Sequence, residues 1–144
     1  MKELKEVLKS QIKIHDELVT LLQKEREALI LFEPDEIERL AREKDMLLMK
    51  IRLFEEERMK LMEELSKKNN LTENITLSKL VELTGDLEYR ELGLKLLSLI
   101  QSVIELNEFN KILVEHSSRH VNNFLVFLEN NGIEPVKCNK TLKV

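Results

Sequence analysis

Apolar residues recur every three or four positions along most of this chain, which is the spacing that gathers them on one face of an α-helix. The first such face consists of Leu4, Val7, Leu8, Ile14, Leu18, Leu21, Leu22, Leu29 and Phe32. The pattern stops at Pro34, which lacks a backbone N–H but suits the first turn of a new helix, and the acids after it favour a helix N-terminus. The pattern therefore predicts a first helix over about residues 1–32.

The second predicted helix, over about residues 35–67, has the most regular pattern in the sequence. Its seam consists of Ile37, Leu40, Lys44, Leu47, Ile51, Phe54, Arg58, Leu61 and Leu65. Alternating steps of three and four residues are typical of a coiled-coil seam. Two of the seam residues, Lys44 and Arg58, are cations, and burying an unpaired charge is strongly destabilising. Each of them therefore needs a polar partner.

A hairpin about Pro34 predicts these partners. Glu25 and Lys44 lie almost equally far from Pro34 on either side, so they meet if the two helices pack antiparallel. The same count places Arg58 opposite Gln11. One matched ion pair in an apolar seam specifies the register, because a slip by one turn would leave both charges unpaired. We predict that Glu25 and Lys44 form this pair.

Residues 66–87 lose the regular spacing and are predicted to form a connector. Its polar first half, SKKNNLTENIT, is followed by TLSKLVEL, which is long enough for two helical turns. Thr76 or Asn74 is a suitable N-cap, and Gly85 is a suitable end. The sequence predicts a short helix over about residues 76–84.

The regular spacing resumes at about residue 88 and continues to Asn131–Gly132, a common helix stop. The seam of this third long helix, over residues 88–130, consists of Leu92, Leu96, Leu99, Val103, Leu106, Asn110, Leu113, Ser117, Val121, Phe124 and Leu128. The pattern as a whole predicts an all-α fold: an antiparallel three-helix bundle or coiled coil, with a long C-terminal helix and a short connector helix. We expect one domain over residues 1–131.

The third long helix is longer than the second. At 1.5 Å per residue, about 43 residues span about 65 Å, against about 48 Å for about 32 residues of the second helix. An antiparallel arrangement brings the third helix level with the hairpin turn near His120, so the remainder overhangs. Its apolar residues are Val121, Phe124, Leu125, Phe127 and Leu128. An apolar helix end without an intrachain partner indicates a partner-binding surface, although packing on the connector helix or on a second copy of the chain remains an alternative.

Two asparagines, Asn107 and Asn110, lie three residues apart within the apolar face of the third helix. A seam asparagine lowers stability but fixes register, because its amide needs a polar partner. We interpret the two asparagines, together with Glu25, Lys44 and Arg58, as a structural polar seam. Direct contact of the asparagines with a partner is the alternative, and the spacing alone does not determine their partners.

Composition narrows the classes of function. The formal charge is −4, and the two signs are interleaved along the chain, which is unlike a surface that follows nucleic-acid phosphates. The N-terminus has no apolar signal core, and no apolar run approaches the roughly 20 residues that span a bilayer. The single cysteine, Cys138, cannot form an internal disulfide. We expect a cytoplasmic protein that does not bind nucleic acid, with a mobile tail over residues 132–144.

The sequence offers no chemistry for catalysis. Phosphate-binding glycine loops, nucleophile motifs and supported pairs of carboxylates are absent, so we expect no enzyme, no cofactor and no small-molecule substrate. His116 and His120 have a spacing that can chelate a metal, but no carboxylate or thiol nearby completes a ligand set. We therefore predict no metal site.

Two segments of the chain resemble the FlgN family of flagellar export chaperones. They are LLQKEREALILFEPDEIERLAREKDMLLMKIRLFEEERMKLM and LLSLIQSVIELNEFNKILVEH. The matching positions are Glu25 and Leu29 in the first helix, Lys44 and Arg58 in the second, and Leu106, Asn107, Asn110 and Leu113 in the third. The resemblance extends over about residues 4–128.

The resemblance implies a cytoplasmic chaperone of the flagellar type III export system that binds hook–filament junction proteins and delivers them to export apparatus components. It also implies binding of these proteins by the C-terminal part of the chain, where the overhang is expected. We expect an amphipathic segment of the junction protein to cover the overhang as a helix in a groove. The tail has no tyrosine, and the sequence assigns no residue to the export apparatus.

Two other functions remain open at this point. The chain could be a chaperone for another flagellar cargo such as the filament cap, or a structural helical bundle that spaces or dimerises other proteins, and a homodimer is compatible with all three. A spacer should bury its apolar seam within its own chain. A chaperone should leave an apolar patch that a specific cargo covers.

Overall fold

The computed structural model describes residues 2–133, which form four α-helices and no strand. The helices are α1 (Lys2–Ile30), α2 (Pro34–Lys68), α3 (Leu77–Thr84) and α4 (Glu88–Asn130). The predicted all-α class is confirmed, and each helix begins and ends within two residues of the predicted positions. The tail that was predicted to be mobile lies outside the described residues except for its first two, and so does Cys138.

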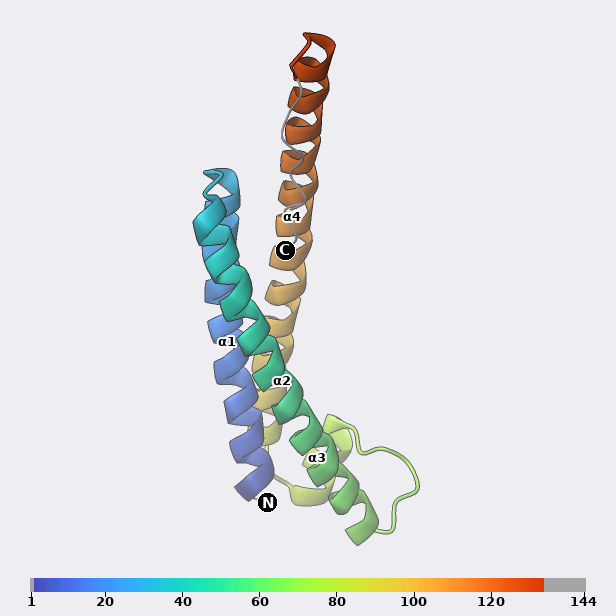
Figure 1. The fold of residues 1–144 in the computed structure, drawn as a ribbon. Coiled ribbons are helices and arrows are strands. Elements are labelled where there is room, and N and C mark those ends of the chain that lie inside the picture. The colour runs from blue at the N-terminus through green and yellow to red at the C-terminus, as the bar shows by residue number, and fades with distance from the viewer. Residues whose placement is uncertain (1, 134–144) are drawn as a thin grey trace.

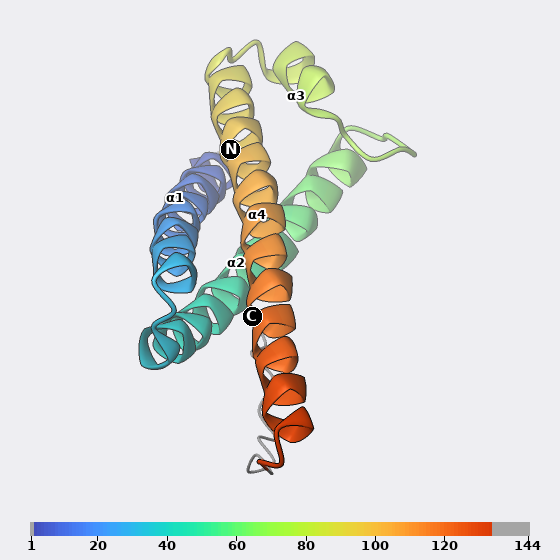
Figure 2. The same cartoon turned by 90° about the horizontal axis from the view of Figure 1, so that it is seen from above.

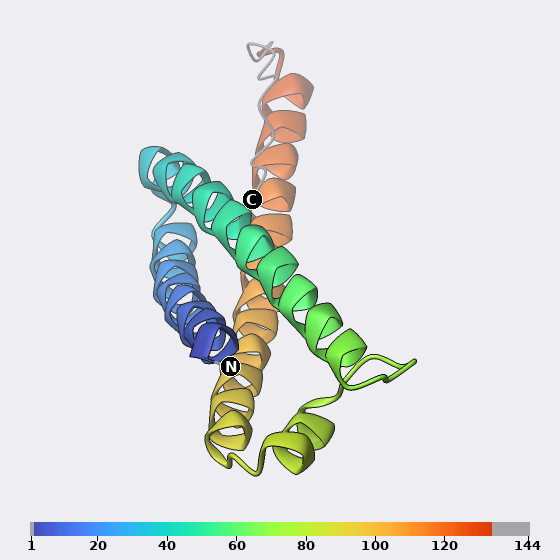
Figure 3. The same cartoon turned by 90° about the horizontal axis from the view of Figure 1, so that it is seen from below.

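The three long helices are arranged with α1 in the middle. α1 and α2 form a hairpin, and α4 runs beside α1 in the same direction and continues past the hairpin turn (Figure 1). α1 packs against both α2 and α4, whereas the backbones of α2 and α4 do not come into contact. α2 crosses away from α4 toward its C-terminal end, and α3 lies near the divergent ends (Figures 2 and 3). The third long helix is therefore antiparallel to α2, as expected, but it packs on α1.

The turn between α1 and α2 differs from the predicted helix boundary. α1 ends at Ile30, and Phe32 has a left-handed backbone with φ 50°. The Phe32 N–H donates to Leu29 O at 3.3 Å and the Glu33 N–H donates to Ala28 O at 3.0 Å, which closes the helix in a Schellman motif. Phe32 was expected on the buried face of the first helix, but it is 50% exposed. The expectation was wrong because the left-handed residue turns the chain out of the helical path.

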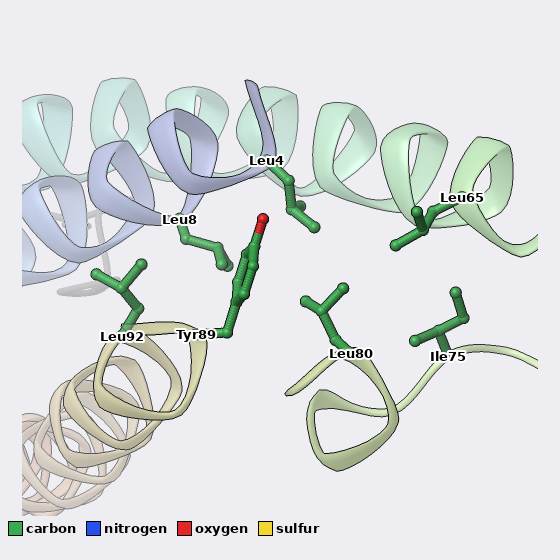
Figure 4. Close-up of a cluster of buried hydrophobic side chains, with 7 residues drawn as sticks. All are labelled: Leu4, Leu8, Leu65, Ile75, Leu80, Tyr89 and Leu92. Carbon is green, nitrogen blue, oxygen red and sulfur yellow. The ribbon is translucent and has the colours of Figure 1, made fainter. Parts of the chain in front are cut away.

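The apolar core includes two clusters, and Val7, Ile14, Leu18 and Leu22 of α1 are buried outside both. The base cluster joins all four helices and the connector through Leu4, Leu8, Leu65, Ile75, Leu80, Tyr89 and Leu92 (Figure 4). The hairpin cluster lies beside the α1–α2 turn and consists of Leu21, Ala28, Leu29, Ile37 and Leu40, against which Leu47, Leu113 and Val114 pack. The two clusters hold α4 at the start and near the middle of its length, and its C-terminal end extends beyond both.

The short helix α3 is held by a cap and by close packing on α4. The Lys79 N–H donates to Oγ1 of Thr76 at 3.2 Å, so Thr76 is the N-cap of the two that the sequence allowed. Gly85, with φ 67°, ends the helix as predicted. A Cβ at Gly93 of α4 would overlap with Cδ2 of Leu77 and lie 3.2 Å from its Cγ. Glycine at position 93 leaves room for the Leu77 side chain against α4, and a larger residue would require that side chain to move.

Charged side chains fasten the beginning of α1 to the beginning of α4. Nζ of Lys5 bonds the carboxylates of Asp86 and Glu88, the latter at 3.0 Å, and lies 5.3 Å from the centroid of the Tyr89 ring. Lys9 lies 3.4 Å from the Glu88 carboxylate. The hydrogen bond from Lys5 lowers the pKa of both carboxyl groups and raises the pKa of Lys5. We call this group the base latch.

Candidate partner-binding site

A buried polar layer joins the three long helices within the hairpin cluster, between Leu21 and Leu47 on one side and Leu29 and Leu40 on the other. Glu25 of α1 and Asn110 of α4 are both 0% exposed, and Nδ2 of Asn110 donates to Oε1 of Glu25 at 2.9 Å. The same nitrogen donates to Leu22 O at 3.0 Å. Nζ of Lys44, from α2, lies 3.5 Å from Oε1 of Glu25, so the predicted pair is present. Lys44 also donates to Oδ1 of Asn107 at 3.3 Å, which links α2 to α4.

The layer contributes specificity rather than net stability. Oε2 of Glu25 and Oδ1 of Asn110 are buried and have no hydrogen-bond partner among the described residues. Unpaired buried polar atoms are destabilising, and a buried ion pair is often no better than an apolar core. A slip of either partner helix would, however, leave the Glu25 carboxylate without Asn110 or Lys44. The layer therefore fixes the register of α2 and α4 on α1.

Arg58 has a partner that the sequence analysis did not name. The prediction placed Arg58 opposite Gln11, but the carboxylate of Glu55 lies between them: it accepts from Arg58 Nε at 2.9 Å and from Gln11 Nε2 at 2.8 Å. The hydrogen bond from Arg58, aided by the one from Gln11, lowers the pKa of Glu55. The spacing of Glu55 three residues before Arg58 was the signal that could have identified it.

The overhang, residues 117–130 of α4, carries the predicted partner-binding residues. Val121, Phe124 and Phe127 are 41%, 60% and 59% exposed, and Leu125 and Leu128 are half-buried. The Phe124 and Phe127 rings are stacked with their centroids 6.3 Å apart. Val126, which the sequence analysis did not include, is 53% exposed.

The rest of the described fold leaves this surface uncovered. The last α4 residues that pack on the hairpin cluster are Leu113 and Val114, so the overhang begins within about one turn of them. α3 lies at the opposite end of α4 (Figure 1), so it does not supply the intrachain cover considered in the sequence analysis. The overhang is thus an apolar helix end that projects past the hairpin.

A second apolar surface lies at the hairpin turn. Ile30, Leu31 and Phe32 are 59%, 67% and 50% exposed, and we call these three residues the hairpin tip. Phe32 was predicted to lie on the apolar face of the first helix, and no prediction was made for Ile30 and Leu31. The only available signal was their position directly before Glu33-Pro34, where a helix must end.

Other chemistry is limited in the described part of the chain. Residues 2–133 contain no group of three or more His, Cys, Asp or Glu side chains placed to hold a metal ion. Nε2 of His116 and Nε2 of His120 lie 3.2 Å apart, a separation compatible with one hydrogen bond between the rings. None of the described helices is long and apolar enough to cross a membrane.

Comparison with known proteins gives one match. The family model described as FlgN protein matches residues 1–132, which is nearly the whole chain and includes the hairpin, the polar layer and the overhang. No curated protein and no solved structure matches the chain.

Proposed function

This chain belongs to the FlgN protein family, which is a family of flagellar export chaperones rather than enzymes, and we propose that its cargo is the hook–filament junction proteins. In this proposal the chain binds them in the cytoplasm, keeps them soluble and unassembled, and delivers them to export apparatus components. It requires no cofactor, metal or small-molecule substrate.

The overhang is the observation that supports this proposal. The five residues that we propose contact the partner are Val121, Phe124, Leu125, Phe127 and Leu128. Three of them expose 41–60% of their surface on a helix that extends past its own bundle. Exposed apolar patches of this kind mark association surfaces, and a projecting helix suits an amphipathic segment packed along it. A cargo segment in this position would cover apolar residues of both partners and prevent their aggregation.

The exposure of the overhang favours a chaperone over a structural spacer. A spacer has no need to expose stacked aromatic rings at the end of its longest helix, whereas a chaperone must offer an apolar surface before its cargo arrives. A chaperone for the filament cap would offer the same kind of surface. The cargo therefore has to be identified by binding.

Calorimetric titration with C-terminal fragments of hook–filament junction proteins tests the proposal. We expect a dissociation constant of about micromolar or tighter for the wild type, and loss of binding in Phe124→Asp/Phe127→Asp with an unchanged circular dichroism spectrum. A matched control is Met46→Asp/Met49→Asp, because these methionines are 64% and 66% exposed on α2, away from the overhang. The control should bind as the wild type does.

Each outcome has a defined meaning. If Phe124→Asp/Phe127→Asp still binds junction fragments, the proposed cargo is correct but the overhang is not its binding site. No binding of junction fragments, with binding of a filament-cap fragment, would reject the cargo. Binding of neither would favour a structural role.

A further inference from the structure

The end of α1 uses an unusual residue. All four described helices are closed by a residue with a left-handed backbone: Asn70 after α2 (φ 54°), Gly85 after α3 (φ 67°), Gly132 after α4 (φ 80°) and Phe32 after α1 (φ 50°). Glycine and asparagine adopt this backbone easily, whereas a bulky aromatic residue is strained there. The Phe32 side chain does not recover this energy in the core, because it is 50% exposed. Neither its backbone conformation nor its exposed ring stabilises the fold, which indicates that Phe32 has a role other than stability.

The hairpin tip and the overhang begin at the same level of the molecule. Leu29, which directly precedes the tip, packs in the same cluster as Leu113 of α4, which lies one turn before the overhang. The α1–α2 turn lies beside the point where α4 continues alone (Figure 1). The tip therefore lies at the base of the overhang.

The apolar face of the overhang continues the face that α4 presents to α1. In steps of three and four residues it runs through Leu106, Asn110, Leu113, Ser117, Val121, Phe124 and Leu128. Asn110 and Leu113 in this series contact α1 or the hairpin cluster. A helix packed on the overhang would thus lie roughly in line with α1, beyond its end. Its own end would then meet the hairpin tip.

The charges around the tip indicate which charge the end of such a helix would carry. Residues 27–38, EALILFEPDEIE, contain five acids and no lysine or arginine, and two of the acids, Glu36 and Glu38, pair with Arg39 and Arg42 of α2. Glu27, Glu33 and Asp35 are exposed, and no ion pair is present for them among the described residues. The overhang itself has only Arg119 and Glu129 as charged residues. The acids that flank the tip make this the negatively charged end of an otherwise nearly uncharged surface, and they are complementary to a cation.

We propose that the hairpin tip and the overhang form one two-part seat for an amphipathic helix of the cargo. The helix has about four turns, because the 14 residues of the overhang span about 21 Å. Its apolar side covers the overhang, and its end, which carries lysine or arginine, abuts Phe32. This inference rests on the proposed function and adds a second contact surface and the chemistry of the bound segment.

Phe32→Gly is the decisive variant, because it removes the ring and at the same time gives the left-handed position the residue that suits it. Asn70→Gly is the matched control: it places a glycine at the equivalent left-handed position after α2, far from the overhang. Both variants and Phe124→Asp/Phe127→Asp are titrated with junction-protein C-terminal fragments. We expect Phe32→Gly to weaken binding about tenfold with a melting temperature equal to or above that of the wild type, and Asn70→Gly to bind as the wild type does.

The outcomes separate this inference from the proposed function. If the wild type binds, the overhang variant does not, and Phe32→Gly binds as tightly as the wild type, the two-part seat is wrong while the proposed cargo and the overhang stand. If the wild type binds no junction fragment, the proposed function and the seat both fail.

A second copy of the chain is the competing occupant of the seat, and sedimentation velocity detects it. A wild type that sediments as a dimer, with Phe32→Gly and Phe124→Asp/Phe127→Asp both monomeric, would assign the seat to the second copy and overturn its assignment to cargo. A monomeric wild type supports the cargo as occupant.

Discussion

Nδ2 of Asn110 lies 2.9 Å from Oε1 of Glu25, and both side chains are completely buried. This bond joins α4 to α1, and Lys44 joins α2 to the same carboxylate oxygen at 3.5 Å. One carboxylate thus sets the position of two helices on a third. Because the overhang is the continuation of α4, this arrangement also determines how far α4 projects past the hairpin.

Replacing Asn110 by leucine should destabilise the fold strongly. The substitution removes both hydrogen bonds from Nδ2 and leaves the buried Glu25 carboxylate with Lys44 alone, for a cost of about 2–4 kcal/mol in the free energy of unfolding. Urea denaturation measures it. Asn107→Leu is the control, because Asn107 is exposed and makes a single bond of 3.3 Å, so its cost should stay below about 1 kcal/mol. Equal costs for the two variants would contradict the central place of Asn110.

Replacing the whole layer should restore stability but not specificity. The triple variant Glu25→Leu/Lys44→Leu/Asn110→Leu leaves no unpaired buried charge, and we expect it to be within about 1 kcal/mol of the wild type or more stable. Without the polar register it should populate more than one oligomer, visible by sedimentation velocity. A triple variant that is as unstable as Asn110→Leu would contradict the expected recovery of stability. A triple variant that remains a single species would contradict the role of the layer in specificity.

Gly93 and Leu77 should be energetically coupled. In a background of Leu77→Ala, Gly93→Ala should stabilise the protein by about 1 kcal/mol, because alanine is the better helix former and the overlapping side chain is gone. In the wild type the same substitution should stabilise less or destabilise, since Leu77 must move away from α4. A double-mutant cycle in urea measures the coupling. Additive effects would mean that α3 does not depend on close approach at Gly93.

The base latch should make stability depend on acid pH. Lys5 lowers the pKa of Asp86 and Glu88 below their ordinary values of 3.8 and 4.5, so the stabilisation is present at neutral pH and is lost as the pH falls through the lowered values. Below about pH 5, Lys5→Met should therefore lose stability less steeply than the wild type, measured by urea denaturation at each pH. The control Lys13→Met, at an exposed position of α1, should follow the wild-type curve. Parallel curves for Lys5→Met and the wild type would contradict the latch.

The acids beside the hairpin tip should make cargo binding sensitive to salt. If a cationic helix end meets the tip, the dissociation constant for junction fragments should rise several-fold between about 0.05 and 0.5 M NaCl, because exposed charge pairs are screened. Glu33→Gln/Asp35→Asn should bind more weakly at low salt and respond less to added salt. Glu63→Gln/Glu64→Gln, which removes two exposed acids far along α2, is the control and should respond as the wild type does. A binding affinity that is independent of salt in the wild type would contradict the cationic end.

The sequence by itself determined the secondary structure. Repeated steps of three and four apolar residues specify helices through local geometry alone, and Pro34, Gly85 and Gly132 end or begin them for reasons of backbone chemistry. The length of α4 follows from the same count, and so does the projection of its apolar end. Glu25 and Lys44 could be paired because a hairpin around one proline leaves a single register to consider.

Only the tertiary structure decided which surfaces meet. Periodicity says that a helix has an apolar face but not which neighbour it faces, so the sequence could not show that α4 packs on α1, that Asn110 contacts Glu25, or that Glu55 lies between Arg58 and Gln11. Phe32 was wrongly placed in the core because its apolar side chain fits the periodic pattern, whereas its exposure follows from a left-handed backbone. Helical periodicity depends on near neighbours, but contacts between helices depend on shape and charge over the whole chain.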